Sequence, residues 1–222
     1  GPISLWDADS HRLVTQMELD DFRPRFLAFI AEQTCLVALN DQGRCRRWSI
    51  QHGVVEPLPV LEIGRWLSAA SGPDPQSVTV ATASGELEAW DLISGVRRSI
   101  DGIVLGRGRN TKVVWDPAGK ILAATQRFGT LDLWNVGQQQ PIRSLGPHSG
   151  SVKAVAFSPT GSLLATGGDR DLALRLWDVS TGDLIARLRE PQSGSNTASF
   201  STDGRFLAAS GSDKTIWLWE IE

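Results

Sequence analysis

Short apolar segments separated by polar turns follow one another along the whole chain. Residues 151–158 form a mostly apolar run, a turn with Pro159 and Gly161 follows, and a second apolar run and a third, alternating one lead to Trp177. Strand-length runs broken by Gly, Pro, Asp or Ser at intervals of roughly 8 to 12 residues are typical of all-β folds. No long segment has the 3.6-residue apolar period of a helix. The pattern predicts an all-β protein.

Tryptophan marks a repeat of this pattern. Six tryptophans are separated by 42, 42, 44, 43 and 42 residues, and a polar or acidic residue follows each of them: Trp6, Trp48, Trp90, Trp134, Trp177 and Trp219. The segments before the last three align with one another: TKVVWDPAGKILAATQRFGTLDLWN, SVKAVAFSPTGSLLATGGDRDLALRLWD and SNTASFSTDGRFLAASGSDKTIWLWE. This regularity predicts one repeat-built domain over residues 3–222. Gly1 and Pro2 are expected to remain from a cleaved purification tag.

The repeat resembles that of the WD-repeat family, whose period is about 40 to 45 residues with four strands per propeller blade. The resemblance covers nearly the whole chain, but RCRRWSI and ELEAWDL in the second and third repeats keep little besides the Trp. It implies a β-propeller of four-stranded antiparallel blades, with first strands at residues 25–32, 65–71, 111–116, 151–158 and 195–201. One equivalent first-strand position is aromatic in four blades and is expected to pack between neighbours: Phe29, Trp115, Phe157 and Phe200.

The resemblance also implies a structural hydrogen-bond network. Members of the family often join a His, a Ser or Thr, an Asp and the Trp within a blade. The matching residues here are His148, Thr166, Asp171 and Trp177, with one extra residue in the turn, and in part Ser210 and Asp213 beside Trp219. Earlier repeats have Gln42, Ser84 and Phe128 at the Asp position, so those blades are expected to rely on packing.

The strand count leaves the closure of the ring open. A third strand (3–8) and a fourth (11–19) precede four complete blades, and three strands end the chain, which makes 21. We expect about five blades, with residues 11–19 as the outer strand of the last blade and ISLWD left over. The alternative is an open fragment of a larger propeller, completed by further chain or by another copy.

Composition excludes several classes of protein. The net charge of −3 gives no general attraction to nucleic acid or anionic lipid, and no apolar run reaches the length of a membrane span. Nothing resembles a signal peptide, so a cytoplasmic location is expected. A hairpin with Asn40 opposite Gly43 would place Cys35 and Cys45 on opposite faces, which predicts free thiols.

Catalytic and metal-binding constellations are not evident in the sequence. The three histidines, His11, His52 and His148, lie at different phases of the repeat, which argues against a shared zinc site. Asp9, Ser10 and His11 are adjacent, and adjacent residues do not form a catalytic triad. The glycines of GRGRNTK (106–112) match no phosphate-binding motif. We therefore expect neither an enzyme nor a bound metal or cofactor.

One set of residues indicates binding. In the family, the fourth-to-first and second-to-third loops share one face, here called the top face. That face would gather Arg and aromatic residues: Phe22, Arg23, Arg25, Arg65, Trp66, Arg107, Arg109, Arg127, Phe128 and Arg170. This composition is typical of interface hot spots, and guanidinium groups pair with carboxylates or phosphates. Codon usage could equally explain the excess of 18 Arg over 4 Lys.

Two functions therefore remain open. The first is a non-catalytic scaffold or sensor module that binds a protein or peptide, preferably an acidic one, on the top face. The AFSPTG and STDG turns are similar to those of bacterial multi-domain members of the family. The second is an assembly module that forms homo-oligomers by exchange of a strand or a blade between copies.

The repeat frame makes a first testable prediction. If Trp90 and Trp177 fill spaces between blades, replacing either by Ala should lower the free energy of unfolding by about 3–5 kcal/mol. For a chain of this size, the melting temperature should then fall by on the order of 10 °C. Two melting curves that coincide with that of the wild type would show that the frame is misassigned.

Overall fold

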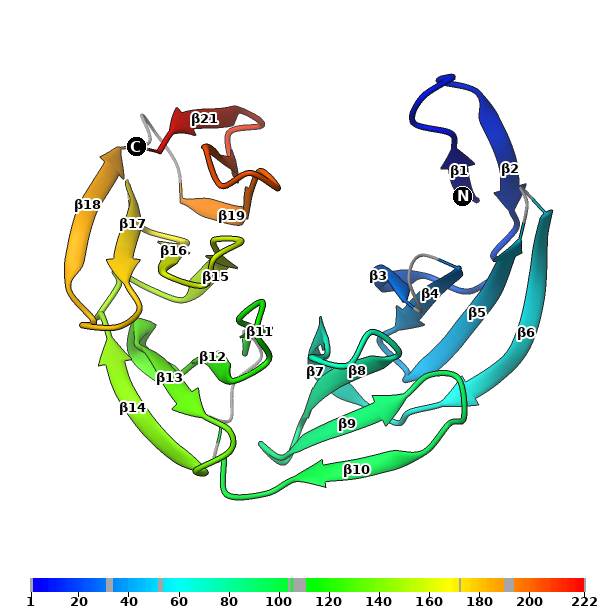
Figure 1. Cartoon of the computed structure of the whole chain (residues 1–222), viewed down its shortest axis with the longest axis horizontal. Coiled ribbons are helices and arrows are strands. Elements are labelled where there is room, and N and C mark those ends of the chain that lie inside the picture. The colour runs from blue at the N-terminus through cyan, green and yellow to red at the C-terminus, as the bar shows by residue number, and fades with distance from the viewer. Residues whose placement is uncertain are drawn as a thin grey trace.

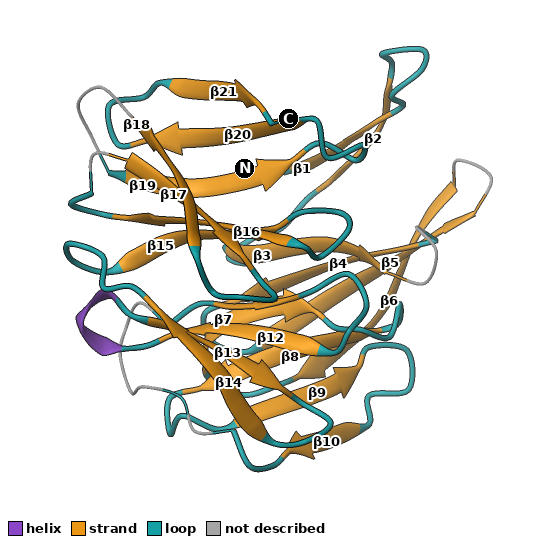
Figure 2. Ribbon diagram, turned by 60° about the vertical axis from the view of Figure 1, so that its left-hand side comes forward, coloured by secondary structure: helices purple, strands orange, loops and turns teal. Residues whose placement is uncertain are grey.

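The regular structure is almost entirely β. The computed structural model describes residues 2–30, 34–51, 54–103, 105, 111–171, 173–189 and 194–221. Within this part of the chain the one helical segment is a single 3-10 turn, η1 (Arg127–Gly129), in the loop between two strands (Figure 2). The predicted all-β class is therefore confirmed.

The described residues contain twenty-one strands in antiparallel sheets, and each sheet contains only strands that follow one another in sequence. An N-terminal hairpin pairs β1 (Ile3–Trp6) with β2 (Leu13–Met17).

Four four-stranded blades follow. Blade 1 has β3 (Pro24–Ile30), β4 (Cys35–Asn40), β5 (Arg44–Gln51) and β6 (Val54–Glu62), and blade 2 has β7 (Trp66–Ser71), β8 (Ser77–Thr82), β9 (Leu87–Asp91) and β10 (Arg97–Ile100). Blade 3 has β11 (Val113–Trp115), β12 (Ile121–Thr125), β13 (Leu131–Asn135) and β14 (Gln140–Leu145), and blade 4 has β15 (Val152–Phe157), β16 (Leu163–Gly168), β17 (Ala173–Asp178) and β18 (Leu184–Arg189). Blade 5 is a three-stranded sheet of β19 (Ser195–Phe200), β20 (Phe206–Gly211) and β21 (Ile216–Glu220).

The sheets are arranged around a central axis, with the first strand of each blade innermost (Figure 1). The architecture is a five-bladed β-propeller, as the repeat predicted. The N-terminal hairpin and blade 5 lie at the two ends of the arc, and no strand pair among the described residues joins them.

The expected outer strand of the last blade is elsewhere. Residues 11–19 were expected to pair with the last third strand, but β2 pairs with β1, with Leu5 opposite Thr15 and Ile3 opposite Met17. A hairpin between neighbouring strands closes a short loop at low entropic cost. One face of the hairpin also packs Ile3 and Leu5 against blade 1. The prediction of this strand pairing is therefore wrong.

The core lies between the sheets rather than within any one of them. All six residues of β4 are buried, because neighbouring sheets cover both of its faces. The largest fully buried side chains are leucines and valines of second and third strands, such as Leu122, Leu133 and Leu164. Each blade therefore depends on its neighbours to remove its apolar surface from water.

A buried arginine also joins two blades. The guanidinium of Arg47 on β5 donates hydrogen bonds to the carbonyl oxygens of Pro59 in its own blade and of Leu92 and Ile93 in blade 2. Because these three carbonyls satisfy the donors of the buried charge, Arg47 can occupy a position that is apolar in most other blades.

The cysteines share one face of their hairpin, contrary to expectation. Cys45 lies opposite Leu39, so it is an even number of positions from Cys35 along the pair. Both thiols are buried in the cluster between blades 1 and 2, and both are free. Burial raises the pKa of the Cys45 thiol to about 12. The prediction of opposite faces is wrong, whereas the prediction of free thiols is confirmed.

The equivalent aromatic residues of the first strands differ in how far neighbouring sheets bury them. Trp115, Phe157 and Phe200 pack into clusters between blades. Phe29 was expected to do the same, but about half of it is exposed, because the N-terminal hairpin has no inner strands to cover it.

Two tryptophans of the repeat provide a matched test of this packing. Trp134 is buried, whereas Trp6 is 59% exposed. Trp134→Ala should lower the free energy of unfolding by about 3–5 kcal/mol, because it leaves a cavity between blades 2 and 3. Trp6→Ala should change it by less than about 1 kcal/mol. Denaturant unfolding of the two variants measures both values, and equal losses would contradict this account of the core.

Candidate binding face

Hydrogen bonds between loops define the top face. In blades 1, 2 and 3, the turn after the second strand contains a residue whose carbonyl accepts an amide from the loop that leads to the next blade. Ile63 donates to Gly43 at 2.6 Å, and His148 donates to Gly129 at 2.8 Å. Gly43 and Gly129 have φ of +87° and +77°, and a Cβ on either would collide with the backbone of the adjoining loop. These glycines let turn and loop lie in direct contact, so the top face is a continuous surface of joined loops.

Blade 4 contains a buried polar network beneath this face. Trp177 Nε1 donates to Thr166 Oγ1 at 2.7 Å, and Thr166 Oγ1 lies 2.7 Å from His148 Nε2. His148 Nδ1 is hydrogen-bonded to Asp171 Oδ2. If each hydrogen has one acceptor, the Thr166 hydroxyl donates to a neutral His148, which donates through Nδ1 to the carboxylate. The four residues therefore form a single chain of donors.

Two further groups complete the network. The amide of Ser149 donates to Asp171 Oδ1 at 2.7 Å, and the guanidinium of Arg175 lies 3.2 Å from Asp171 Oδ2. Arg175 also donates to the carbonyl of Pro147 at 2.7 Å. Sequence reasoning missed Arg175, although its place opposite Thr166 in the β16–β17 pair is the signal that would have found it.

The titration of the two acid–base groups follows from this environment. Burial lowers the pKa of His148 below its ordinary value of 6.5, and the charge of Arg175 lowers it further. Burial alone would raise the pKa of Asp171, but hydrogen bonds from Ser149 and His148, together with the charge of Arg175, outweigh it and lower the pKa. The native network therefore holds a neutral imidazole and an ionised carboxylate.

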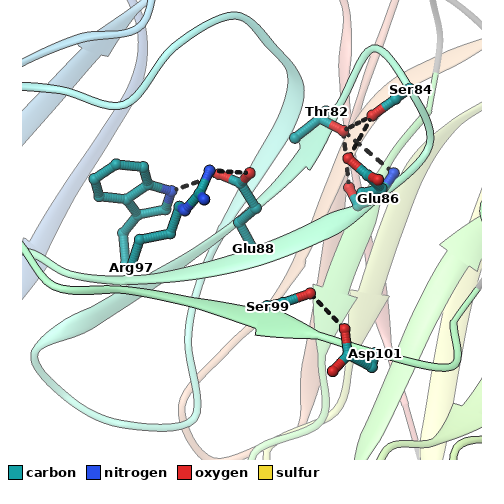
Figure 3. Close-up of polar contacts among 8 residues, drawn as sticks. Thr82, Ser84, Glu86, Glu88, Arg97, Ser99 and Asp101 are labelled. Carbon is teal, nitrogen blue, oxygen red and sulfur yellow. Dashed lines mark hydrogen bonds and ion pairs between the residues drawn. The ribbon is translucent and has the colours of Figure 1, made fainter.

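The other blades satisfy their tryptophans differently. In blade 2, Trp90 Nε1 donates to Glu88, which also pairs with Arg97 at 3.1 Å (Figure 3). Thr82, Ser84 and Glu86 hold the second turn of that blade by local hydrogen bonds (Figure 3). In blade 3, Ala124 takes the place of Thr166, and the buried Trp134 Nε1 has no partner among the described residues.

Blade 5 does not bring its matching residues together in the same way. Asp213 accepts the amide and the hydroxyl of Thr215, at 3.0 and 2.5 Å, within its own turn. Thr215 in turn accepts Trp217 Nε1, at 2.7 Å. Trp219 packs with blade 4, and Ser210 is paired with β21.

Apart from Phe128, the expected top-face residues fall into three groups. Four are exposed cations that make no hydrogen bond or ion pair with any described residue: Arg23, Arg25, Arg65 and Arg170. Two are aromatic residues with structural contacts. Trp66 is half-buried and donates to the carbonyl of Asn40 at 2.8 Å. Phe22 was expected to be exposed but is buried, with the guanidinium of Arg46 5.1 Å from its ring centre. Arg107 and Arg109 lie outside the described residues, and of Arg127 only the main chain, in η1, is described.

Phe128 is the most unusual residue of this face. Its side chain is 91% exposed, and its backbone has φ 62° and ψ 26°. A large non-glycine residue in this left-handed region is uncommon, and an exposed Phe gains nothing from burial. The next residue, Gly129, approaches Gly150 closely, and a Cβ on Gly150 would lie 3.2 Å from Arg170 Cγ. An exposed aromatic ring and a free guanidinium therefore project from adjoining turns of blades 3 and 4.

The described residues offer little for metal or membrane chemistry. No group of three or more His, Cys, Asp and Glu side chains in this part of the chain is arranged to hold a metal ion. No helix among the same residues is long and apolar enough to cross a membrane.

These features define a repeat-built β-propeller in which each third strand carries a tryptophan at or near its end. The family model described as WD domain, G-beta repeat matches residues 139–178 and 182–220. The chain belongs to the WD-repeat family.

Several curated proteins are similar to this chain. Nuclear distribution protein PAC1 of Arthroderma otae is 32% identical over 69% of the chain and 33% of its own length. WD repeat and SOCS box-containing protein 1 of Danio rerio is 24% identical over 86% of the chain and 50% of its own length. Autophagy-related protein 18 of Saccharomyces cerevisiae is 33% identical over 42% of the chain and 19% of its own length. The chain thus spans half or less of the length of these relatives.

The pKa of His148 makes stability depend on pH. Because the native pKa is lowered, the unfolded state binds more protons than the native state once the pH falls below about 6.5. The contribution of His148 is thus present above that pH and is lost as the pH falls toward the native pKa. His148→Gln should cost about 1–3 kcal/mol near neutral pH, because it leaves buried partners unsatisfied.

The measurement is urea unfolding of the wild type and His148→Gln from about pH 7.5 to about pH 5. The difference in the free energy of unfolding between the two proteins should become smaller as the pH falls. His11→Asn, a change at an exposed histidine outside the network, serves as the control for the loss of an imidazole. A difference that stays constant over this range would contradict the neutral state of His148.

Proposed function

We propose that this chain is a non-catalytic interaction module that binds a protein or peptide on its top face. WD-repeat propellers generally serve as protein-interaction scaffolds, which supports the class of function. The observation that carries the proposal is Phe128, an almost fully exposed apolar side chain on a strained turn. Strain and exposure of this kind are typical of binding sites, where a partner covers the ring.

The charge of the face supports an acidic partner. Arg44 and Arg46 are paired with Glu62 and Asp20 at 3.4 Å, so their charges are already balanced. Arg65 and Arg170 have no such partner among the described residues and remain available to a carboxylate or phosphate. The ligand we propose is a peptide segment with an apolar residue for Phe128 and flanking acidic residues for these guanidinium groups. A cytoplasmic location and a bacterial source agree with this proposal but remain expectations.

Panning a random peptide library against the immobilised protein tests the proposal. Enriched peptides should carry an apolar residue next to Asp or Glu. Phe128→Asn and Arg170→Glu should each weaken their binding at least about tenfold, the loss expected of a hot-spot residue. Because Asn tolerates left-handed backbone, Phe128→Asn should fold as well as the wild type.

Ile185→Thr is the matched control, because Ile185 is an exposed apolar residue on the outer strand of blade 4. It should leave affinity unchanged, and binding to the wild type should weaken as salt is added. Enriched peptides that bind Phe128→Asn as tightly as the wild type would place the binding site elsewhere.

A further inference from the structure

One contact recurs at every junction between neighbouring sheets. The tryptophan that ends a third strand packs against residues of the preceding third strand, located one and three positions before that strand's own tryptophan. Trp177 shares a cluster with Leu131 and Leu133 of blade 3. Trp219 shares one with Leu174 and Leu176 of blade 4.

The other three junctions keep this contact wholly or in part. Trp48 of blade 1 packs with Ile3 and Leu5 of the N-terminal hairpin. Trp134 packs with Leu87 of blade 2, and Trp90 packs against the cluster that contains Cys45 of blade 1, so each of these two has one member of the pair. A junction therefore has two halves, a tryptophan on one sheet and one or two apolar residues on the sheet before it.

At each end of the arc, one half of this contact has no partner on a neighbouring sheet among the described residues. Trp6, the tryptophan of the hairpin, is 59% exposed because no sheet precedes it. On β21 the equivalent apolar pair is Ile216 and Leu218, which are 79% and 66% exposed. These residues are the counterparts of Ile3 and Leu5, since ISLWD and IWLWE occupy the same place in the repeat.

The exposed surface around Trp6 extends along blade 1. Leu27 and Phe29 of β3 lie opposite Ala38 and Leu36, which the hairpin covers, but are themselves about half exposed. The N-terminal end thus presents a tryptophan and two large apolar side chains, and the C-terminal end presents an apolar pair. Exposed apolar groups gathered in this way mark interaction surfaces.

We propose that blade 5 of one copy docks on the N-terminal hairpin of a second copy, with Ile216 and Leu218 against Trp6. A second copy is the occupant because this chain carries both halves of a contact that it makes internally with the full apolar pair at three junctions and with one member of the pair at two. The two surfaces differ, so the contact is head-to-tail and each copy has one of each. Such contacts grow into chains or close into rings. This interaction uses the ends of the arc and is independent of the top face.

Light scattering coupled to size-exclusion chromatography tests the proposal. The mass of the wild type should rise above 24.1 kDa as the protein is concentrated over a hundredfold range. Trp6→Glu and Leu218→Glu should each abolish open-ended growth, because each removes one half of the contact. Ile185→Glu introduces the same charge at an exposed apolar residue away from both ends, so it should associate like the wild type.

Mixing the two end variants gives the decisive result. Each variant retains one intact surface, so an equimolar mixture should form a dimer and nothing larger, whereas each variant alone should remain monomeric. Circular dichroism checks that both are folded. As a second measurement, a mixture of Trp6→Cys and Leu218→Cys should form a disulfide-linked heterodimer in preference to either homodimer, because the native cysteines are buried.

Three results would overturn the proposal. The wild type could stay at 24.1 kDa at every concentration, which would mean that something other than a second copy covers the two ends. Either variant could continue to self-associate alone, which would indicate contacts between like surfaces. The mixture could fail to form a dimer although both variants are folded and the wild type associates.

Discussion

The fold depends on the packing of each repeat tryptophan against the third strand of the sheet before it. A single four-stranded sheet has two apolar faces, and the hydrogen bonds within it do nothing to cover them. The indole ring is large enough to fill the space between two inclined sheets, and the apolar pair beneath it fixes where the ring lies. Trp48, Trp134 and Trp177 are buried in this way, and the exposed Trp6 shows the same residue without its neighbour. The order of the blades around the axis follows the order of the repeats along the chain, and this contact joins each blade to the one before it.

Features that depend on local sequence could be predicted, and features that depend on neighbouring sheets could not. The repeat predicted the number of strands, 21, and the positions of the first strands, because apolar runs and turn residues are encoded within each unit. Phe22 was expected to be exposed but is buried, and Phe29 was expected to be buried but is about half exposed. The burial of both side chains depends on which sheet lies beside them. The register at Cys45 was wrong by one position. Asn40 Oδ1 accepts the amides of Gln42 and Arg44, and Gly43 has φ +87°, which together make that turn one residue longer than assumed.

In the candidate site, too, residue types set by local sequence could be predicted, whereas features set by surrounding contacts could not. The types of residue in the blade 4 network were evident from sequence, because they recur at fixed distances from the tryptophan. The charge balance that keeps His148 neutral was not, since it depends on Arg175 and on the amide of Ser149. Sequence alone cannot distinguish an arginine that is already paired, such as Arg46 with Asp20, from Arg170, which makes no ion pair with a described residue.

The restriction of every sheet to strands adjacent in sequence has a consequence for how such a protein can change over evolutionary time. A duplication or deletion of one unit of 42 to 44 residues would add or remove a whole blade without breaking a hydrogen-bonded sheet elsewhere. Only one junction would have to be remade, and every unit already carries the tryptophan for it. A lineage could therefore alter the number of blades in a single genetic step and adjust the curvature afterwards. A fold that threads a distant strand into its central sheet has no equivalent route.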